Sequence, residues 1–177
     1  MAVSALVTTA GSATANAYVT LAIADQYHED RPANSSTAWS GATDAAKNAA
    51  ILWATTLLDA HFNWTGWTVD STQVLEWPRS GMWKRTGFET VSTTVIPPEI
   101  QEATAEFAKQ LLAADRAADS DVETQGLTEL QVDVIRMKFK EDVIAKVVPD
   151  VIANLIPAGW YESIRGHRRM SVRIVRT

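Results

Sequence analysis

The chain has 177 residues, and its 46% hydrophobic and 21% charged residues are close to the averages of globular domains. Its net charge of −5 argues against a protein that coats a polyanion through a general positive field, although a local basic patch remains an option. With no cysteine, the chain has no disulfide, thiol nucleophile or thiolate metal site. No apolar run approaches the roughly 20 residues of a membrane span, and a basic signal-peptide segment is missing, so we expect an intracellular or particle-associated protein.

The first third of the chain predicts an arm followed by a short helix. Residues 1–16 are small and mixed in polarity, which is typical of an extended arm. Thr20 is a plausible N-cap for a helix that ends at Arg31-Pro32. The histidine and acidic residues at the end of this helix, His28 to Asp30, are expected to be solvated. Residues 33–42 are then expected to form a loop anchored by Trp39.

A longer helix is predicted from Thr43, as the N-cap, through about Phe62. Apolar residues lie on both of its sides, so we expect a central helix packed on more than one face. One stripe is Ala46, Ala49, Ala50, Trp53, Leu57 and Ala60. The segment 63–95 has no sustained period and predicts an ordered irregular connection, which needs its own anchors. The candidate anchors are Trp64, Trp67, Trp77 and Trp83.

Pro97-Pro98 predicts the start of the most regular helix, because proline is tolerated in a first turn. Its core face repeats every three or four residues: Ile100, Ala103, Phe107, Leu111, Ala114 and Ala118. Its solvent face is expected to carry Glu102, Glu106, Lys109 and Gln110. An acidic linker follows and ends at Gly126.

Residues 127–140 change to a period of two, which predicts a β segment. The phase slips by one between Val134 and Ile135, so either a β-bulge or two strands are expected. Pro149 predicts the start of a short helix, which ends at the Pro157-Ala158-Gly159 sequence.

These patterns predict a mainly α fold, a small helical bundle with a long ordered Trp-rich connection, a short β segment and extended terminal arms. The expected organisation is an N-terminal arm (1–16), a helical domain (17–160) with the β segment near 127–140, and a basic C-terminal tail (161–177).

The last sixteen residues carry five arginines and one glutamate, a net charge of +4 on an otherwise acidic chain. These arginines are Arg165, Arg168, Arg169, Arg173 and Arg176. Such asymmetry is typical of a tail that meets an acidic partner. An arm that adds a strand to a neighbour is favoured slightly over a nucleic-acid arm and over a disordered end.

The sequence EWPRSGMWKRTGF, residues 76–88, combines aromatic rings with three basic side chains. Rings interleaved with Arg79, Lys84 and Arg85 could stack bases and track phosphates of a single strand. Alternatively, Trp77 and Trp83 could fill core around a turn, with Pro78 fixing the chain's entry and Gly81 adopting a turn conformation. The second interpretation is favoured, with Lys84 and Arg85 presented to a neighbouring subunit.

No nucleotide-binding glycine loop, nucleophile elbow or zinc-binding helix motif is present. The three histidines are far apart in sequence, at His28, His61 and His167. Asp59 and His61 lie two residues apart on a predicted helix and therefore point to different sides. We expect no catalytic residues, no metal and no cofactor.

Several stretches of the chain, in their order and spacing, resemble a family of tailed-phage proteins. They are ANAYVTLAIADQYHEDR, ATDAAKNAAILWATTLLDAHFNWTGW, LEWPRSG and IPPEIQEATAEFAKQLL, which together cover roughly residues 13 to 115. This family is labelled DnaT-like single-stranded DNA-binding protein, and in architecture it is similar to head–tail connector adaptors. The element from Trp77 to Gly81 is its most recognisable piece.

The resemblance implies a non-catalytic adaptor at the head–tail junction of a virion, assembled in the host cytoplasm. Its implied partners are its own copies in a ring, expected to be a dodecamer, together with the portal protein and a tail or tail-completion protein. Duplex DNA would pass through the lumen without specific binding. The arginines of the tail, with Lys84 and Arg85, would contact the portal or a neighbouring subunit. The alternative is a DnaT-like single-stranded DNA-binding protein that assists replication.

Overall fold

The computed structural model describes residues 3–32, 37–115, 129–132, 135–138 and 146–165 of the chain. Within these ranges it has five α-helices and three two-stranded antiparallel sheets. The helices are α1 (Leu21–Glu29), α2 (Thr37–Ser40), α3 (Asp44–His61), α4 (Pro98–Ala113) and α6 (Asp150–Leu155). The sheets pair β1 (Phe62–Trp64) with β6 (Tyr161–Ile164), β2 (Trp67–Thr68) with β3 (Arg79–Ser80), and β4 (Glu129–Val132) with β5 (Ile135–Lys138). The predicted mainly helical fold with a short β segment is confirmed.

The helices begin at the residues that the sequence predicts. The Thr20 side chain accepts a hydrogen bond from the Ile23 amide at 3.3 Å, and the Thr43 side chain accepts one from the Ala46 amide at 3.3 Å. Each cap satisfies an amide that would otherwise lack a partner in the first helical turn. Helix α4 instead starts with proline at its first position, where the missing N–H is not needed.

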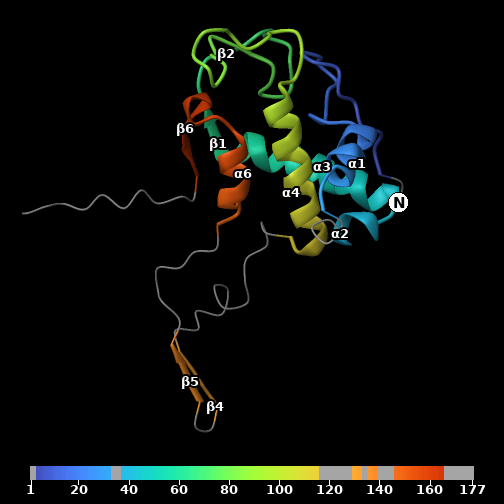
Figure 1. The fold of residues 1–177 in the computed structure, drawn as a ribbon, viewed down its shortest axis with the longest axis vertical. Helices are drawn as coiled ribbons and strands as arrows, with labels where there is room; N and C mark the ends of the chain where they lie inside the picture. The colour runs from blue at the N-terminus through green and yellow to red at the C-terminus, as the bar shows by residue number, and fades with distance from the viewer. Residues whose placement is uncertain (1–2, 33–36, 116–128, 133–134, 139–145, 166–177) are drawn as a thin grey trace, which may run out of the picture.

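The core forms where α4 packs against α3, with α1, α2 and α6 placed around it. Its centre is made of aliphatic and aromatic side chains from these helices, including Ile51, Leu58, Ile100, Phe107 and Ile152. Figure 1 shows α4 crossing α3 in the middle of the molecule, with α6 beside α4. Burying these side chains supplies most of the stabilisation of such a bundle, because isolated helices of this length are marginal in water.

Helix α3 buries part of the stripe that the sequence predicts, namely Ala50 and Leu57, together with residues on its other apolar side. Its buried residues include Ile51, Ala54 and Leu58, while Trp53 is 40% exposed. Trp53 lies outside the buried stripe, and its indole N–H donates to Asp115 at 3.1 Å. The expectation that Trp53 is a core residue is therefore wrong.

Two polar residues that were expected in solvent are buried between α1 and α4. Glu106 is 4% exposed, and its carboxylate pairs with Arg31 at 2.5 Å and with Lys109 at 2.6 Å. His28 is 2% exposed, and its Nε2 lies 3.1 Å from the Ala105 carbonyl oxygen. Burial lowers the pKa of His28. Ion pairing compensates the burial of Glu106, which a helical period alone could not predict.

The expected β segment near 127–140 is a hairpin of two strands. Strands β4 and β5 pair from Glu129 opposite Lys138 to Val132 opposite Ile135. The slip in the period-two pattern therefore falls between two strands, and two strands are one of the two expected outcomes. The short helix expected after Pro149 is also present as α6, and Pro149 is its N-cap.

The N-terminal residues lie against the bundle, and the described part of the C-terminal end pairs with a strand. The Val7 amide donates to the Asn16 side chain at 2.7 Å, and Leu6 packs on the core. Strand β6 pairs with β1, with Phe62 opposite Ile164, so the first four residues of the expected tail belong to a sheet. No helix within the described ranges is long and apolar enough to cross a membrane.

Candidate nucleic-acid interface

The connection between β1 and α4 encloses a cluster of aromatic rings that supports its outer part. Trp77 is 1% exposed, and its ring centroid lies 5.0 Å from that of Trp160 and 5.5 Å from that of Trp64. Trp64 in turn stacks on Phe62 at 4.7 Å. The expectation that Trp77 is a core anchor is confirmed, and the cluster joins the connection to β1 and to the residues before β6.

The inner segment, residues 76–81, is the turn that the sequence predicts around Trp77, Pro78, Arg79 and Gly81. Arg79 is buried at 7% exposure, where its guanidinium donates to the Thr65 carbonyl at 2.7 Å and to the Gly66 carbonyl at 2.9 Å. It also forms an ion pair with Glu76. Arg79 is therefore committed to holding the turn and is not available to a phosphate. The Trp77–Pro78 peptide bond is cis.

Gly81 ends the inner segment at a position that other residues resist. Its φ is +78°, in the left-handed region that favours glycine. A Cβ atom here would lie 2.9 Å from the Trp67 ring, so this ring lies directly over the Gly81 backbone. The glycine thus allows the chain to turn beneath Trp67 and to enter the next segment.

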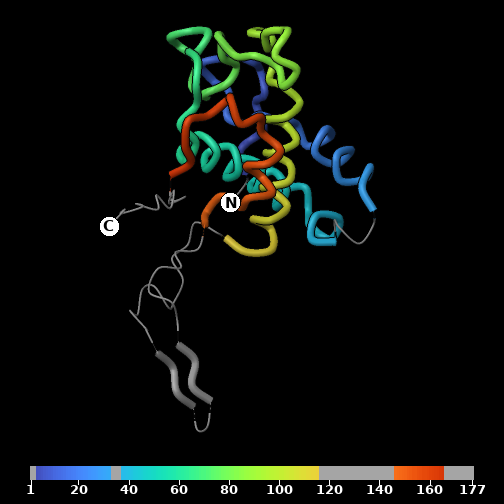
Figure 2. The backbone as a smooth tube through the Cα atoms, turned by 60° about the vertical axis from the view of Figure 1, so that its left-hand side comes forward, coloured from blue at the N-terminus to red at the C-terminus, as the bar shows by residue number. Residues whose placement is uncertain are grey.

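Residues 82–91 form a short hairpin-like excursion, called the exposed hairpin below. The Val91 amide donates to the Met82 carbonyl at 2.9 Å, and the Lys84 amide donates to the Glu89 carbonyl at 2.8 Å. A β-bridge joins Trp83 to Thr90 between these two bonds. The exposed hairpin is therefore ordered by its own backbone. Figure 2 shows the connection that contains it at the end of the bundle where α4 begins.

The exposed hairpin and the neighbouring strand β2 carry large aromatic side chains in contact with solvent. Trp83 is 57% exposed, Phe88 is 90% exposed and Trp67 is 72% exposed. Trp67 and Trp83 were expected to anchor the connection in the core, and this expectation is wrong. Trp83 is held instead by its backbone, because its carbonyl accepts a hydrogen bond from the buried Trp160 indole at 2.7 Å.

Two basic residues, Lys84 and Arg85, directly follow Trp83 in the exposed hairpin. Lys84 pairs with Glu89 at 2.6 Å, and this contact raises the pKa of Lys84 and lowers that of Glu89. Arg85 is exposed and donates to the Leu155 carbonyl at 3.4 Å, near the limit of a hydrogen bond. Within the described part of the chain, Arg85 makes no ion pair, so most of its N–H donors can contact a phosphate.

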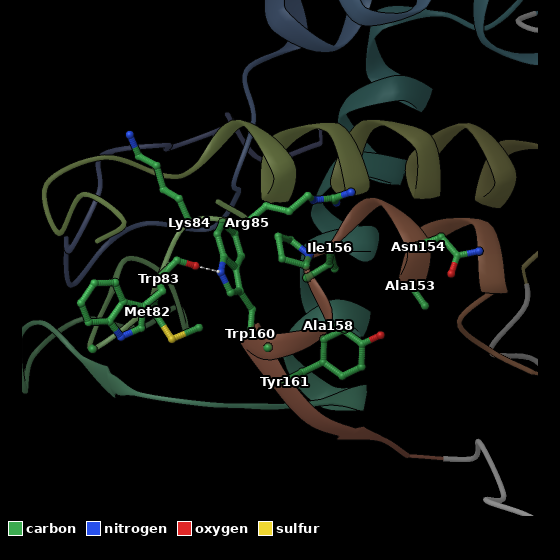
Figure 3. A pocket seen from close by; sticks show the side chains of 13 residues that line it. Met82, Trp83, Lys84, Arg85, Ala153, Asn154, Ile156, Ala158, Trp160 and Tyr161 are labelled. Atoms are coloured by element: carbon green, nitrogen blue, oxygen red, sulfur yellow. Dashed lines mark hydrogen bonds between the residues drawn. The ribbon is translucent and has the colours of Figure 1, made fainter. Parts of the chain in front are cut away.

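A cavity of about 560 Å³ lies at the foot of the exposed hairpin. It is bounded on one side by residues 81–85 and on the other by residues of α6 and the turn before β6, including Asn154, Ile156 and Tyr161. In Figure 3 the Arg85 side chain extends from the hairpin toward Ile156 and α6, and the Tyr161 ring lies on the other side of Ile156. Sequence patterns gave no signal for this cavity, because its two walls are about 70 residues apart in the chain.

A cluster of polar groups around Asp59 supports the inner segment through a hydrogen bond to Glu76. The Tyr18 hydroxyl donates to one carboxylate oxygen of Asp59, and the Glu76 amide donates to the other at 3.2 Å. Burial raises the pKa of Asp59 to about 7. Asp59 was considered only as a partner of His61, but the structure joins it to the N-terminal residues and the connection, and His61 lies instead by the Arg165 carbonyl at 3.4 Å.

The remaining candidate residues do not form a second site in the described ranges. Arg165 is exposed at the end of β6, where its amide donates to the His61 carbonyl at 2.7 Å. The other candidate arginines, Arg168, Arg169, Arg173 and Arg176, lie outside the described residues. No group of three histidine or acidic residues within the described part of the chain could hold a metal ion.

The fold and this surface define a small helical domain that presents aromatic and basic side chains on an ordered loop. Residues 4–177 match the family described as "Putative DnaT-like ssDNA binding protein", and the chain therefore belongs to that family. This match extends on both sides of the resembling stretches at residues 13–115. No curated protein and no solved structure matches the chain significantly.

The family match corrects the expected function. The expectation of a head–tail connector adaptor, with its phage, portal and virion terms, is wrong, because the matching family is described by single-stranded DNA binding. The alternative that the sequence left open is the one that the match supports. The physical reason for the error lies in Trp83. The favoured interpretation of the sequence places this side chain in the core, whereas in the structure it lies in solvent.

Proposed function

We propose that this protein binds single-stranded DNA through the exposed hairpin and catalyses no reaction on it. The observation that carries the proposal is Trp83, a large aromatic side chain that is 57% exposed and is followed directly by two basic residues, Lys84 and Arg85. Proteins that bind single strands combine aromatic rings, on which bases stack, with cations that follow the phosphates. Exposing a tryptophan forgoes the stabilisation of burial, and Trp83 shares its connection with two further exposed rings, Trp67 and Phe88, which favours a binding role for this region.

The support beneath Trp83 favours a binding surface over a mobile loop. The Trp160 indole fixes the Trp83 carbonyl, and the ring of Trp160 packs on buried Trp77. A residue whose backbone is already fixed loses less conformational entropy when a base stacks on its ring. Phe88 and Trp67 offer further ring faces on the same connection, and stacking on a ring does not depend on the identity of the base.

The acidic character of the whole chain does not oppose this proposal. Salt at physiological strength screens charges beyond about 8 Å, so a bound strand responds mainly to the side chains close to it. Near Trp83 these include Arg85, which makes no ion pair within the described ranges, and Lys84, whose partner Glu89 is itself exposed. A few phosphate contacts therefore suffice for a salt-dependent contribution to binding.

The test is the affinity of the full chain for a fluorescent oligothymidylate, measured by anisotropy beside a duplex of the same length. We expect the single strand to bind more tightly than the duplex. Trp83→Ala should weaken single-strand binding by about 1–3 kcal/mol, since one stacked base is lost. Arg85→Ala should reduce the slope of log affinity against log salt by about 0.7.

The matched control is Trp53→Ala, because Trp53 is also an exposed tryptophan but lies on α3. Its removal should leave the affinity for the single strand unchanged. The proposal fails if the wild-type protein has no affinity for the single strand, or if Trp53→Ala and Trp83→Ala weaken binding equally.

A further inference from the structure

The cavity at the foot of the exposed hairpin is continuous with the proposed DNA-binding surface. Trp83, Lys84 and Arg85 belong both to the hairpin and to the wall of the cavity. A strand that stacks on Trp83 therefore runs past the cavity entrance. The volume of about 560 Å³ lies within the range of about 300–1,000 Å³ found for small-molecule sites.

The lining of the cavity matches the chemistry of a nucleobase, which has two apolar faces and a polar edge. Ile156 and Met82 supply apolar surface, and the half-buried Tyr161 supplies an aromatic ring. The exposed Asn154 supplies an amide that can both donate and accept hydrogen bonds. An amide of this kind pairs with the polar edge of a base, most favourably with adenine.

Arg85 supplies a cation for the phosphate that adjoins such a base. Its side chain extends along the cavity toward α6, as Figure 3 shows, where it donates a long hydrogen bond to the Leu155 carbonyl. A phosphate would replace this bond to an uncharged carbonyl with one in which donor and acceptor are both charged, which is stronger. The cation and the apolar wall are therefore placed for the two parts of one nucleotide.

The walls of the cavity are held together by hydrogen bonds that do not involve the proposed ligand. Thr65 joins them, because its hydroxyl donates to the Gly159 carbonyl at 2.9 Å on one wall and lies 3.4 Å from the Met82 sulfur on the other. The Trp160 indole then donates to the Trp83 carbonyl at 2.7 Å. The cavity is thus formed before any ligand enters, which lowers the cost of binding.

We infer that this cavity is a subsite for one nucleobase, with Arg85 contacting the adjoining phosphate. The inference rests on the proposed function, because it takes the base to come from a single strand bound on the exposed hairpin. A free mononucleotide has the same chemistry and is the alternative source that the experiment must separate. The subsite adds a base-reading element, Asn154, to a surface whose stacking rings are indifferent to sequence.

The decisive variant is Gly159→Leu, which adds a bulky side chain to the cavity wall and leaves Trp83 and Arg85 in the sequence. Gly159 lines the cavity, and a Cβ atom built on it meets no atom within 4 Å, so the backbone accepts a side chain there. We expect this variant to bind single-stranded DNA roughly tenfold more weakly, as for the loss of one stacked base. Ala49→Leu, at an exposed position of α3, is the control for added bulk and should bind as the wild type.

A second variant, Asn154→Ala, keeps the cavity open and removes only the amide. We expect the wild-type protein to prefer oligodeoxyadenylate over oligothymidylate and Asn154→Ala to lose this preference. Because Asn154 is exposed, this variant tests the subsite even where Gly159→Leu lowers stability. Thermal unfolding of each variant provides the check on folding.

The outcomes separate the subsite from the proposed function. If Gly159→Leu and Asn154→Ala bind every oligonucleotide as the wild type does while Trp83→Ala loses affinity, the subsite is refuted and the proposed function stands. If the wild type binds no single strand, the proposed function fails and the subsite with it. If deoxyadenosine monophosphate binds the wild type and Gly159→Leu removes this binding without weakening the strand, the base comes from a free nucleotide and the inference is overturned.

Discussion

The inner segment (residues 76–81) and the exposed hairpin (residues 82–91) are consecutive in sequence but differ in what surrounds their tryptophans. Trp77 is 1% exposed and packs against two other indole rings, whereas Trp83 is 57% exposed and is held through its backbone. Their arginines differ in the same way, since Arg79 is buried in carbonyl contacts and Arg85 lies in solvent. Residue type therefore does not determine the role. A tryptophan and an arginine stabilise the fold in the inner segment. The same two residue types are available for binding in the exposed hairpin.

The difference arises from the partners that the rest of the chain supplies. Trp64 and Trp160 flank Trp77 from two distant parts of the sequence, and they leave no room for a ligand. The exposed hairpin lies beyond this cluster and is ordered by its own backbone hydrogen bonds. A rigid support beneath an exposed ring is the arrangement that a stacking surface needs, because a base gains most from a ring that is already positioned.

The largest expected effect is the loss of stability in Trp77→Ala. Removing this buried indole should lower the free energy of unfolding by about 3–5 kcal/mol, because a cavity replaces its packing against Trp64 and Trp160. Urea denaturation measures this change. Trp83→Ala is the matched comparison and should stay within about 0.5 kcal/mol of the wild type. Equal losses in the two variants would contradict the division between the inner segment and the exposed hairpin.

A smaller effect is expected from pH through Asp59, which accepts hydrogen bonds from Tyr18 and from the Glu76 amide. The pKa of Asp59 is raised from 3.8 to about 7 in the folded protein. Between these values the folded state keeps a proton that the unfolded state has lost, so raising the pH through this window favours unfolding. From about pH 5 to about pH 8 this group should lower the free energy of unfolding by about 2–3 kcal/mol.

Asp59→Asn isolates this contribution, because asparagine is similar in shape and does not titrate. The difference in unfolding free energy between the variant and the wild type, measured by urea denaturation across the same pH range, should grow in favour of the variant as pH rises. A difference that is constant with pH would show that Asp59 is ionised throughout and that its burial does not raise the pKa. Any fixed cost of the lost hydrogen bond to the Glu76 amide is removed by comparing slopes.

Most of the helical fold follows from local signals in the sequence. Thr20, Thr43, Pro98 and Pro149 mark the helix starts because capping and proline chemistry are properties of neighbouring residues. The phase slip before Ile135 likewise marks the change from β4 to β5. Which face of a helix is buried is harder to predict, because it depends on elements elsewhere in the chain. Trp53 and Glu106 were assigned to the wrong environment because their burial depends on α4 and α1 packing from outside their own helix.

The candidate interface was only partly predictable for the same reason. The residues 76–88 were recognised as aromatic and basic, and the role of Trp77 in the core was correct. The exposure of Trp83 depends on Trp160, which fills the neighbouring core space from 77 residues further along the chain. The cavity wall contributed by Asn154 and Gly159 has no signature of its own. Long-range packing therefore determines that Trp77 is buried and that Trp83 faces solvent.

The smallest expected effect concerns the ion pair between Lys84 and Glu89 on the exposed hairpin. Glu89 pairs with Lys84 at 2.6 Å and competes with any phosphate for this ammonium group. Because Lys84 lowers the pKa of Glu89, the carboxylate is ionised at neutral pH and the competition persists there. Glu89→Gln should therefore strengthen binding to the single strand, by less than Trp83→Ala weakens it, with an increase that shrinks as salt is raised. Glu29→Gln makes the same charge change at an exposed position on α1 and is the control in the anisotropy titration. If both variants strengthen binding equally, the strand responds to the net charge of the protein and not to the Lys84–Glu89 pair. That result would contradict the proposal that the phosphates bind at the exposed hairpin.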